Sequence, residues 1–452
     1  MSALEKALNH SENLEIDECE VVELKKNITT VRINDSEIAE IKQNFDVNYG
    51  IRIIHEKKIA SIETTKQEEI PNAISNSIQN MDTLKKREFW KGLPSKSNFS
   101  EIQGIYDVKL EEISGTKAAD IAENLINSTL DQKITSVTGS LNIVSENFEL
   151  SNSNGLSLDE KSTYISAIIN AESEKSTIPV SGIGHSSGRT LDSFSPEQVG
   201  EDAKTMCLES INPEKIDSGE YSIIFEPYSV GELLAFVIAA NFNFKTFSEK
   251  KSCFTNNFQK EITVKDFSLT DDPHSVNGIG SKSFDDEGIE TRSQKLIENG
   301  IFKNTYANLY DSFKENSTST GNGLRMGSPM GRSSEPIPVS APHNLKVENG
   351  DTSQEEMIKN TKKGILVSRL WYTYAVNPIK GDFSCTARSG IRIIKDGKIV
   401  GPGKSVRVIH NLPTMLRNIS SVGNNQQNVI QWASLPSITP SIKAENIFVN
   451  SI

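Results

Sequence analysis

Apolar residues in the first part of the chain switch between the spacing of a strand and the spacing of a helix. From residue 18 to residue 65, short runs rich in β-branched residues are separated by polar turns, and this pattern predicts a meander of short strands. The predicted strands are 20–24, 30–33, 38–41 and 50–54. Alternation returns from residue 133 to residue 172, with a turn at Asn152–Gly155 that joins two further strands.

Apolar residues recur every three or four positions in four other segments of this half. This spacing predicts helices with one apolar face each, which would cover the sheet. The predicted helices are 1–10, 67–87, 116–130 and 195–210. The last has a clear beginning, because Ser195 can cap it and Pro196 suits the first helical position.

A change of composition at residues 212–219 predicts a domain boundary, so we expect two domains, 1–212 and 213–452. The second opens with a strand at 221–225 and an apolar helix from Pro227 to Ala240, and strand patterns dominate after it. Asn299-Gly300 is the strongest hairpin signal in the chain. The expected fold class is α+β, with an N-terminal meander sheet plus helices and a curved antiparallel β-rich C-terminal domain.

Composition narrows the class of protein. The 452 residues carry a formal net charge of -12, and an acidic surface repels DNA phosphates, so direct nucleic-acid binding is not expected. The four cysteines form no C-x-x-C pair, which is typical of reduced thiols. No apolar run approaches the roughly 18 residues that span a bilayer, and the first residues lack a basic, apolar leader. We expect a soluble, cytoplasmic protein without a membrane partner.

The segment Gly278–Gly288 combines three glycines with three consecutive carboxylates, Asp285, Asp286 and Glu287. Adjacent side chains point in different directions, so these three carboxylates cannot share one task. One can close a turn, one can pair with a cation and one can face a cleft. A solvated acidic turn would explain the same residues.

Residues 315–335 are rich in Gly, Ser, Thr and Asn and hold Arg325 and Arg332. A loop of about twenty residues is long for a compact domain. The segment is therefore predicted to be either a flexible surface loop or a lid over a cleft, and to be mobile in the isolated protein.

The run Gly280–Gly288 resembles the Gly-Ser-x-x-Phe-Asp-Asp-Glu-Gly signature of the TldD/PmbA family, also called modulators of DNA gyrase. Further segments resemble the family in the same order, and together they cover nearly the whole chain: Ser151–Gly155, Ser319–Gly323, Gly381–Ser384 and Val422–Asn424. The two glycine-bearing motifs at 280–288 and 319–323 supply the predicted substrate-binding residues, Asp285, Asp286, Glu287, Gly321, Asn322 and Gly323.

In the zinc-bearing branch of that family a helix carries His-Glu-x-x-x-His, and a later cysteine completes the metal site. Here the matching helix keeps only Glu232, with Gly231 and Phe236 in the histidine places, and Ser421–Asn425 has no cysteine. The resemblance therefore implies the PmbA (TldE) branch, a subunit with no metal of its own. It would join a zinc-bearing TldD-type partner in a complex that cuts unfolded peptides, and Glu232 is the predicted catalytic residue.

Two alternatives stay open, so the sequence leaves open whether the chain is itself an enzyme. The chain could be an autonomous peptidase whose site is built from distant residues, such as His185, His274 and Cys385. It could also be a non-enzymatic binding or assembly protein that uses its cleft to hold extended peptides. A homodimer is expected where the TldD-type partner is missing.

Overall fold

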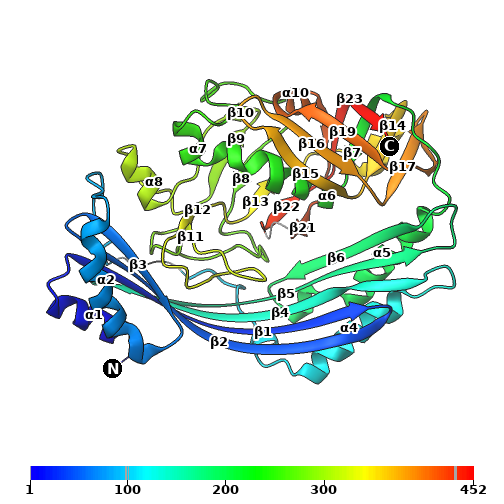
Figure 1. Cartoon of the computed structure of the whole chain (residues 1–452). Coiled ribbons are helices and arrows are strands. Elements are labelled where there is room, and N and C mark those ends of the chain that lie inside the picture. The colour runs from blue at the N-terminus through cyan, green and yellow to red at the C-terminus, as the bar shows by residue number, and fades with distance from the viewer. Residues whose placement is uncertain (1, 97–98, 100, 432–434) are drawn as a thin grey trace.

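The computed structural model describes residues 2–96, 99, 101–431 and 435–452. A long, twisted sheet with helices on its outer face forms the N-terminal half, and a β-rich C-terminal half lies over its inner face (Figure 1). The α+β fold class is confirmed.

The N-terminal sheet has six antiparallel strands in the order β3-β2-β1-β4-β5-β6. Its strands are β1 (Glu18–Asn34), β2 (Glu37–His55), β3 (Lys58–Thr64), β4 (Ser136–Asn152), β5 (Ser157–Ser173) and β6 (Val180–Gly188). The meander of residues 18–65 and the turn before β5 are confirmed, but the division into four short strands is wrong. The polar run Lys25–Asn27 stays paired with β2, because the Lys26 side chain binds a carboxylate inside the protein.

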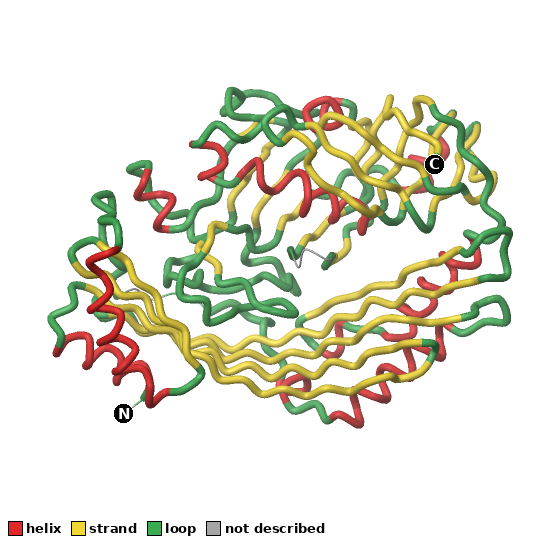
Figure 2. Tube along the Cα trace, viewed as in Figure 1, coloured by secondary structure: helices red, strands yellow, loops and turns green. Residues whose placement is uncertain are grey.

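Three predicted helices of this half are confirmed with ends shifted by a few residues, as α1 (Ala3–Asn13), α4 (Gly115–Thr129) and α5 (Pro196–Glu209). The predicted helix 67–87 is confirmed only in its middle, as α2 (Ile70–Asn80) between 3-10 turns at Gln67–Glu69 and Met81–Thr83, and residues 84–87 are not helical. A short additional helix, α3 (Val108–Glu111), precedes α4. Figure 2 shows these helices along the outer face of the sheet. Alternate side chains of β1 explain this layer, because Val21 packs toward α1 whereas Val31 and Ile33 pack toward α4.

The inner face of the sheet carries the other set of β1 side chains. Val22 and Leu24 pack with Phe148 of β4 and with Phe284 of the C-terminal half. Glu20 and Lys26 lie on the same face and are also buried. The two halves are therefore joined by a mixed layer of apolar and charged side chains.

The C-terminal half holds two larger sheets. The nine-stranded sheet contains β7 (Gly219–Phe225), β14 (Lys363–Val367), β15 (Leu370–Asn377), β16 (Asp382–Ala387), β17 (Ile391–Lys395), β18 (Lys398–Pro402), β19 (Val406–Asn411), β20 (Ile419–Val422) and β23 (Ile442–Ser451). The six-stranded sheet contains β8 (Leu269–Asp271), β9 (Gln294–Glu298), β10 (Ile301–Phe302), β13 (Leu345–Val347), β21 (Gln427–Val429) and β22 (Ser437–Thr439). Antiparallel pairing dominates, but β7 pairs with β14, and β13 with β22, in parallel.

The remaining elements of this half are short. They are the strand pair β11 (Gly323–Leu324) and β12 (Val339–Ser340) and the helices α7 (Phe244–Ser248), α8 (Leu309–Lys314), α9 (Gln354–Lys359) and α10 (Leu412–Arg417). The predicted hairpin is confirmed, because Asn299 and Gly300 both adopt positive φ between β9 and β10.

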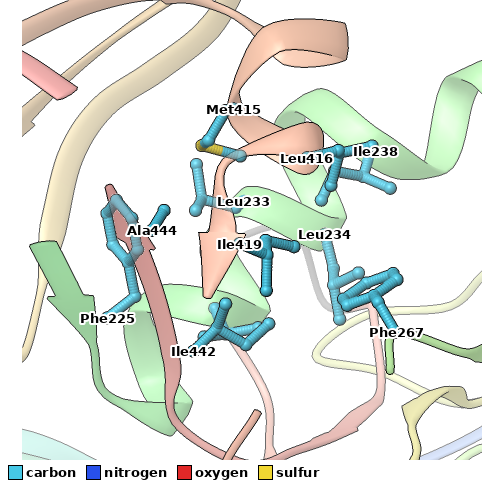
Figure 3. A pocket seen from close by; sticks show the side chains of 11 residues that line it. Phe225, Leu233, Leu234, Ile238, Phe267, Met415, Leu416, Ile419, Ile442 and Ala444 are labelled. Carbon is cyan, nitrogen blue, oxygen red and sulfur yellow. The ribbon is translucent and has the colours of Figure 1, made fainter. Parts of the chain in front are cut away.

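The apolar helix predicted from Pro227 changes its winding along its length. It begins as α6 (Pro227–Leu233), widens to a π-helix over Leu234–Ile238 and ends as a 3-10 turn at Ala239–Phe242. Its buried side packs on β7, β20, β23 and α10, where the apolar side chains enclose a cavity of about 20 Å³ (Figure 3). The helix is thus fixed in the core of the C-terminal half.

Within the described residues, no helix has both the length and the apolar character needed to cross a membrane. The first sheet and its helices end at Glu209, and the C-terminal sheet starts at Gly219. The predicted division at residue 212 lies between these points and remains a prediction, because the contacts between the halves are extensive.

The contact between β6 and α5 yields a stability prediction. A Cβ atom on Gly184 would lie 1.8 Å from the carbonyl oxygen of Val199, so Gly184→Ala must push the helix from the sheet. We expect a loss of about 1–3 kcal/mol in the free energy of unfolding, measured by urea denaturation. Gly401→Ala is the matched control, because nothing lies within 4 Å of the added atom. Equal midpoints for the two variants would contradict the close packing.

Candidate functional site

The acidic turn at residues 285–287 is fully buried. Asp285, Asp286 and Glu287 each have 0% of their surface exposed, so the reading as a solvated turn is wrong. Asp285 closes the turn, because its carboxylate accepts the backbone N–H groups of Glu287 at 3.0 Å and Ile289 at 2.9 Å. Its second oxygen accepts the N–H of Gly323 at 2.8 Å and ties the turn to β11.

Asp286 pairs with cations from two segments. Its carboxylate lies 3.0 Å from Lys282 Nζ and 2.7 Å from Arg332 Nε, and it also accepts the N–H of Arg325 at 2.7 Å. Burial alone would raise the pKa of Asp286, but the charges of Lys282 and Arg332 outweigh it and lower the pKa to about 2. The carboxylate is held ionised at the interface.

Glu287 reaches across to the N-terminal sheet. One oxygen lies 2.9 Å from Arg52 Nη1 on β2, and the other accepts the N–H of Leu309 at 2.7 Å at the start of α8. Arg52 in turn contacts Glu20 of β1 at 2.9 Å, and Glu20 also pairs with Arg325. A continuous series of ion pairs therefore links β1 and β2 to the C-terminal segments around residues 287 and 325.

A second branch of charges lies beside Phe148 and Phe284. The Arg332 guanidinium stands 4.6 Å and 5.0 Å from the centres of these two rings and contacts Glu160 of β5 at 2.7 Å. Lys26 contacts Glu146 at 2.8 Å next to it. We call the whole set the buried ion-pair network: Glu20, Lys26, Arg52, Glu146, Glu160, Lys282, Asp286, Glu287, Arg325 and Arg332.

From residue 321 onward the segment 315–335 is not the surface loop predicted from its composition, whereas residues 315–318 are exposed; its mobility and its role as a lid stay predictions. Leu324, Arg325, Met330 and Arg332 are buried, and residues 323–324 pair with β12. The segment lies between the long sheet and the C-terminal half in Figure 1. The prediction failed because charge partners on β1 and β5 fix the two arginines, and composition does not show such partners.

The predicted substrate-binding residues at 321–323 are brought together with the acidic turn. Asn322 is buried and donates to Asp271 Oδ2 at 2.6 Å and to the Ala341 carbonyl at 3.0 Å. Gly321 has a φ of 77°, and Gly323 lies against the Glu287 side chain. Substrate binding by these six residues remains a prediction, and the geometry favours a scaffold role because their polar groups bind partners within the chain.

Glu232 lies on α6 in a separate, largely buried position. Its Oε2 accepts the N–H of Leu370 at 2.6 Å, where β15 begins. Burial raises the pKa of Glu232 to about 8, although that N–H and the Arg369 guanidinium act in the opposite direction. Such a carboxyl group holds or exchanges a proton near neutral pH, which suits acid–base chemistry.

The site assembled from distant residues is only partly brought together. His185 on β6 stacks against Tyr228 of α6 with ring centres 4.6 Å apart, and burial lowers the pKa of His185 to about 4. Cys385 lies near Glu232, and burial, together with the Glu232 carboxylate, raises the pKa of the Cys385 thiol to about 12. His274 lies elsewhere, 3.1 Å from Thr291 Oγ1, so the set His185, His274 and Cys385 is not one site.

The part of the chain that the structure describes contains no group of three His, Cys, Asp or Glu side chains that could hold a metal ion. Gly231 faces Val429 and Gln431, and Phe236 is partly exposed, so neither position next to Glu232 offers a ligand. The residues present at α6 therefore do not fit zinc.

An open groove of about 500 Å³ runs beside the π-helix. Its lining includes Ala235, Ala239, Asn243, Met326, Ser340 and Pro342. The strand β15 ends the nine-stranded sheet and hydrogen-bonds to β16 alone among the named strands. Tyr372 and Val376 of this edge strand are exposed. Edge strands and grooves are the places where extended peptides bind.

Sequence reasoning missed the cationic half of the network and the groove. Glu20 and Arg52 interrupt apolar runs in β1 and β2. This interruption could have indicated a buried ion pair, because a charge on a buried strand face needs a partner. No local pattern indicated which residue that partner would be.

Family models place this architecture in a known class. The PmbA/TldA metallopeptidase domain 1 matches residues 19–80, the central domain matches 107–210 and the C-terminal domain matches 218–451. The fold and its domains define a metallopeptidase-like protein. The chain belongs to the PmbA/TldD family, as the matches over all three domains show.

Individual relatives agree with this family. The chain is 24% identical over 417 residues to metalloprotease PmbA of Escherichia coli O157:H7, covering 90% of this chain and 88% of that protein. TldE of Thermococcus kodakarensis has the same fold, with a TM-score of 0.88, 23% identity and coverage of 99% and 100%. A candidate modulator of a DNA gyrase from Thermotoga maritima has a TM-score of 0.86 at 20% identity, covering 99% of each chain.

The buried network predicts a large effect of Arg52→Met on stability. This variant leaves Glu20 without one partner and removes the one cation that contacts Glu287 among the described residues, so we expect a loss of about 3–5 kcal/mol in the free energy of unfolding. Arg32→Met is the control, because it removes an exposed pair between the same two strands and should change stability by less than about 1 kcal/mol. Similar urea midpoints for both variants would contradict this role.

The position of Glu232 predicts a pH dependence. An unfolded glutamate releases its proton near pH 4.5, whereas folded Glu232 keeps it until about pH 8, so its contribution to stability is lost as the pH rises between these values. We expect the thermal midpoint to fall less from pH 5 to pH 8.5 in Glu232→Gln than in the wild type. The control Glu197→Gln, exposed on α5, should follow the wild type. Parallel pH curves for all three proteins would disprove the raised pKa.

Proposed function

We propose that this chain is a PmbA/TldE-type subunit of a two-component metallopeptidase. A TldD-type partner carries the zinc ion and cuts the peptide, and this chain completes the complex and holds the substrate in an extended form. The proposal rests on membership of the PmbA/TldD family together with the ligand-poor helix α6.

The single observation that carries the proposal is the environment of Glu232. A hydrolytic zinc site needs about three nitrogen, sulfur or carboxylate ligands and a carboxylate that takes the proton of the bound water. Here only the carboxylate is present, because Gly231 and Phe236 have no ligating atom in their side chains. Glu232 moreover uses one oxygen to bind the start of β15. The chain thus has a helix at this position, but the side chains at positions 231 and 236 cannot bind zinc.

Peptide holding is supported by the edge of the nine-stranded sheet and by the groove. An extended peptide that pairs with β15 would satisfy backbone groups that lack a strand neighbour, and this binding is insensitive to sequence. The groove beside the π-helix offers a second surface for side chains. All four cysteines are unpaired thiols, which supports a reducing, cytoplasmic location.

The raised pKa of Glu232 favours one alternative, an autonomous peptidase. In that case Glu232 would act as a general base, with Arg369 and the buried Tyr228 hydroxyl beside it. This alternative makes the opposite prediction for a variant at that position.

The test combines metal analysis with reconstitution. We expect purified protein, dialysed against chelator, to contain less than one-tenth of a zinc ion per chain and to cleave no unfolded peptide alone. Mixed with a zinc-bearing TldD-type subunit, it should give a heterodimer that cleaves the peptide. Glu232→Gln should retain at least half of the activity of the mixture, because the reaction takes place on the partner.

Three outcomes would decide against the proposal. Zinc at one ion per chain would move the metal site to this protein. Cleavage by the chain alone, abolished in Glu232→Gln, would establish the autonomous peptidase. Peptide binding without any cleavage in the mixture would indicate that the chain is a non-enzymatic binding or assembly protein. Glu197→Gln is the matched control in every arm.

A further inference from the structure

A small polar cavity lies next to the buried ion-pair network, at the contact between β4, β5 and the segments around residues 280 and 330. Its volume is about 60 Å³, and its lining includes Arg189, Lys282 and His343. Met326 and Pro342 line both this cavity and the open groove beside the π-helix, so the two spaces are neighbours. A cavity of this size and polarity admits a few waters or one small polar group.

Arg189 is a buried cation that no carboxylate of the described residues contacts directly, although Glu146 and Glu160 act on it from farther away. Its guanidinium donates to three backbone carbonyls, those of Gly278 at 3.1 Å, Thr163 at 3.2 Å and Ser281 at 2.8 Å. Within the described ranges no carboxylate oxygen lies within 4.0 Å of it, unlike Arg52, Arg325 and Arg332. Two of its five N–H groups remain for a ligand. Burial lowers the pKa of Arg189 to about 10.

His343 presents a second unmet polar group at the same cavity. Its side chain is 1% exposed, and its Nδ1 lies 3.2 Å from the Asp271 carboxylate and 3.2 Å from Asn322 Nδ2. In the neutral tautomer in which Nδ1 accepts the N–H of Asn322, Nε2 carries the ring proton and is a donor. Asp271 also accepts the backbone N–H of His343 at 2.7 Å, which fixes the residue in place. The other ring nitrogen, Nε2, is buried and has no hydrogen-bond partner. A buried ring nitrogen held this way is normally matched by a ligand or a water.

The acidic side chains at the cavity do not neutralise Arg189. Glu146 contacts Lys26 at 2.8 Å and accepts the N–H of Arg332, and Asp286 is held by Lys282 and Arg332. Arg189 and Lys282 therefore leave positive charge beside the cavity. The three carbonyls that accept from Arg189 offset part of the cost of burying its charge, and an anion would offset more.

We propose that this cavity binds one oxyanion group, with Arg189 as its charge partner and His343 Nε2 and Lys282 Nζ as further donors. The group is either free inorganic phosphate or the terminal carboxylate of a peptide that enters from the neighbouring groove. The proposal does not depend on zinc, on a partner subunit or on cleavage, so it stands or falls separately from the proposed function.

The first test measures binding of inorganic phosphate to the full-length chain by calorimetry and by the thermal midpoint, at constant ionic strength with chloride as the reference anion. We expect saturable binding and a midpoint that rises with phosphate concentration. Arg189→Gln should weaken binding by about tenfold to a hundredfold, which is the effect of losing a charge-assisted hydrogen bond. Arg32→Gln, which changes an exposed arginine of β1, should bind as the wild type does.

The second test separates the two sources of the oxyanion. A flexible peptide with a free carboxyl end and the same peptide with an amidated end are compared by calorimetry. Tight binding of the free acid alone, competed by phosphate, identifies a peptide terminus. Binding of phosphate with no difference between the peptides identifies a free anion.

His343→Gln keeps the proposal testable if Arg189→Gln fails to fold. It should weaken anion binding several-fold, and in the wild type the Nε2 nitrogen resonance of His343 should shift on saturation with phosphate. Equal phosphate binding in wild type, Arg189→Gln and His343→Gln would overturn the proposal. So would the absence of any saturable effect of both phosphate and free-acid peptide, which would leave a cavity filled by water.

Discussion

The buried charges between the inner face of the long sheet and the turn at residues 285–287 set the arrangement of this protein. Each carboxylate there has a cation or backbone donors, and removing one partner leaves an uncompensated charge away from water. The segment with Arg325 and Arg332 is held in place by the same contacts, and α8 begins on Glu287. Such pairs add less to stability than an apolar layer would, so their value lies in fixing one orientation of the halves.

Local chemistry made much of the fold predictable. Ser195 and Pro196 marked the start of α5, and Asn299-Gly300 marked the hairpin between β9 and β10. Both signals act within a few residues. The lengths of β1 and β2 were not predictable from the same rules. Lys26 in the middle of β1 suits the interior because Glu146, opposite it on the paired strand β4, and two backbone carbonyls of the segment 330–332 bind its ammonium group.

The candidate site shows the same limit. Adjacent carboxylates were expected to serve different tasks, and Asp285 does close a turn while Asp286 does pair with cations. The third task was wrong, because Glu287 faces Arg52 and not a cleft. The resemblance to the family was enough to single out Glu232, but not the Leu370 N–H that binds it. The groove and the cavity at Arg189 depend on surfaces from remote segments, which no spacing along the chain encodes.

The distance along the chain between the two ends of these ion pairs has a consequence for synthesis. Glu20 and Arg52 are translated early, whereas Glu287 follows Arg52 by 235 residues and Arg325 follows Glu20 by 305. Until those later residues leave the ribosome, the long sheet exposes an inner face with apolar side chains and unmatched charges. Exposed apolar surface of this kind favours aggregation of incomplete chains, and these ion pairs between the halves can form only after the chain through Arg332 has been made.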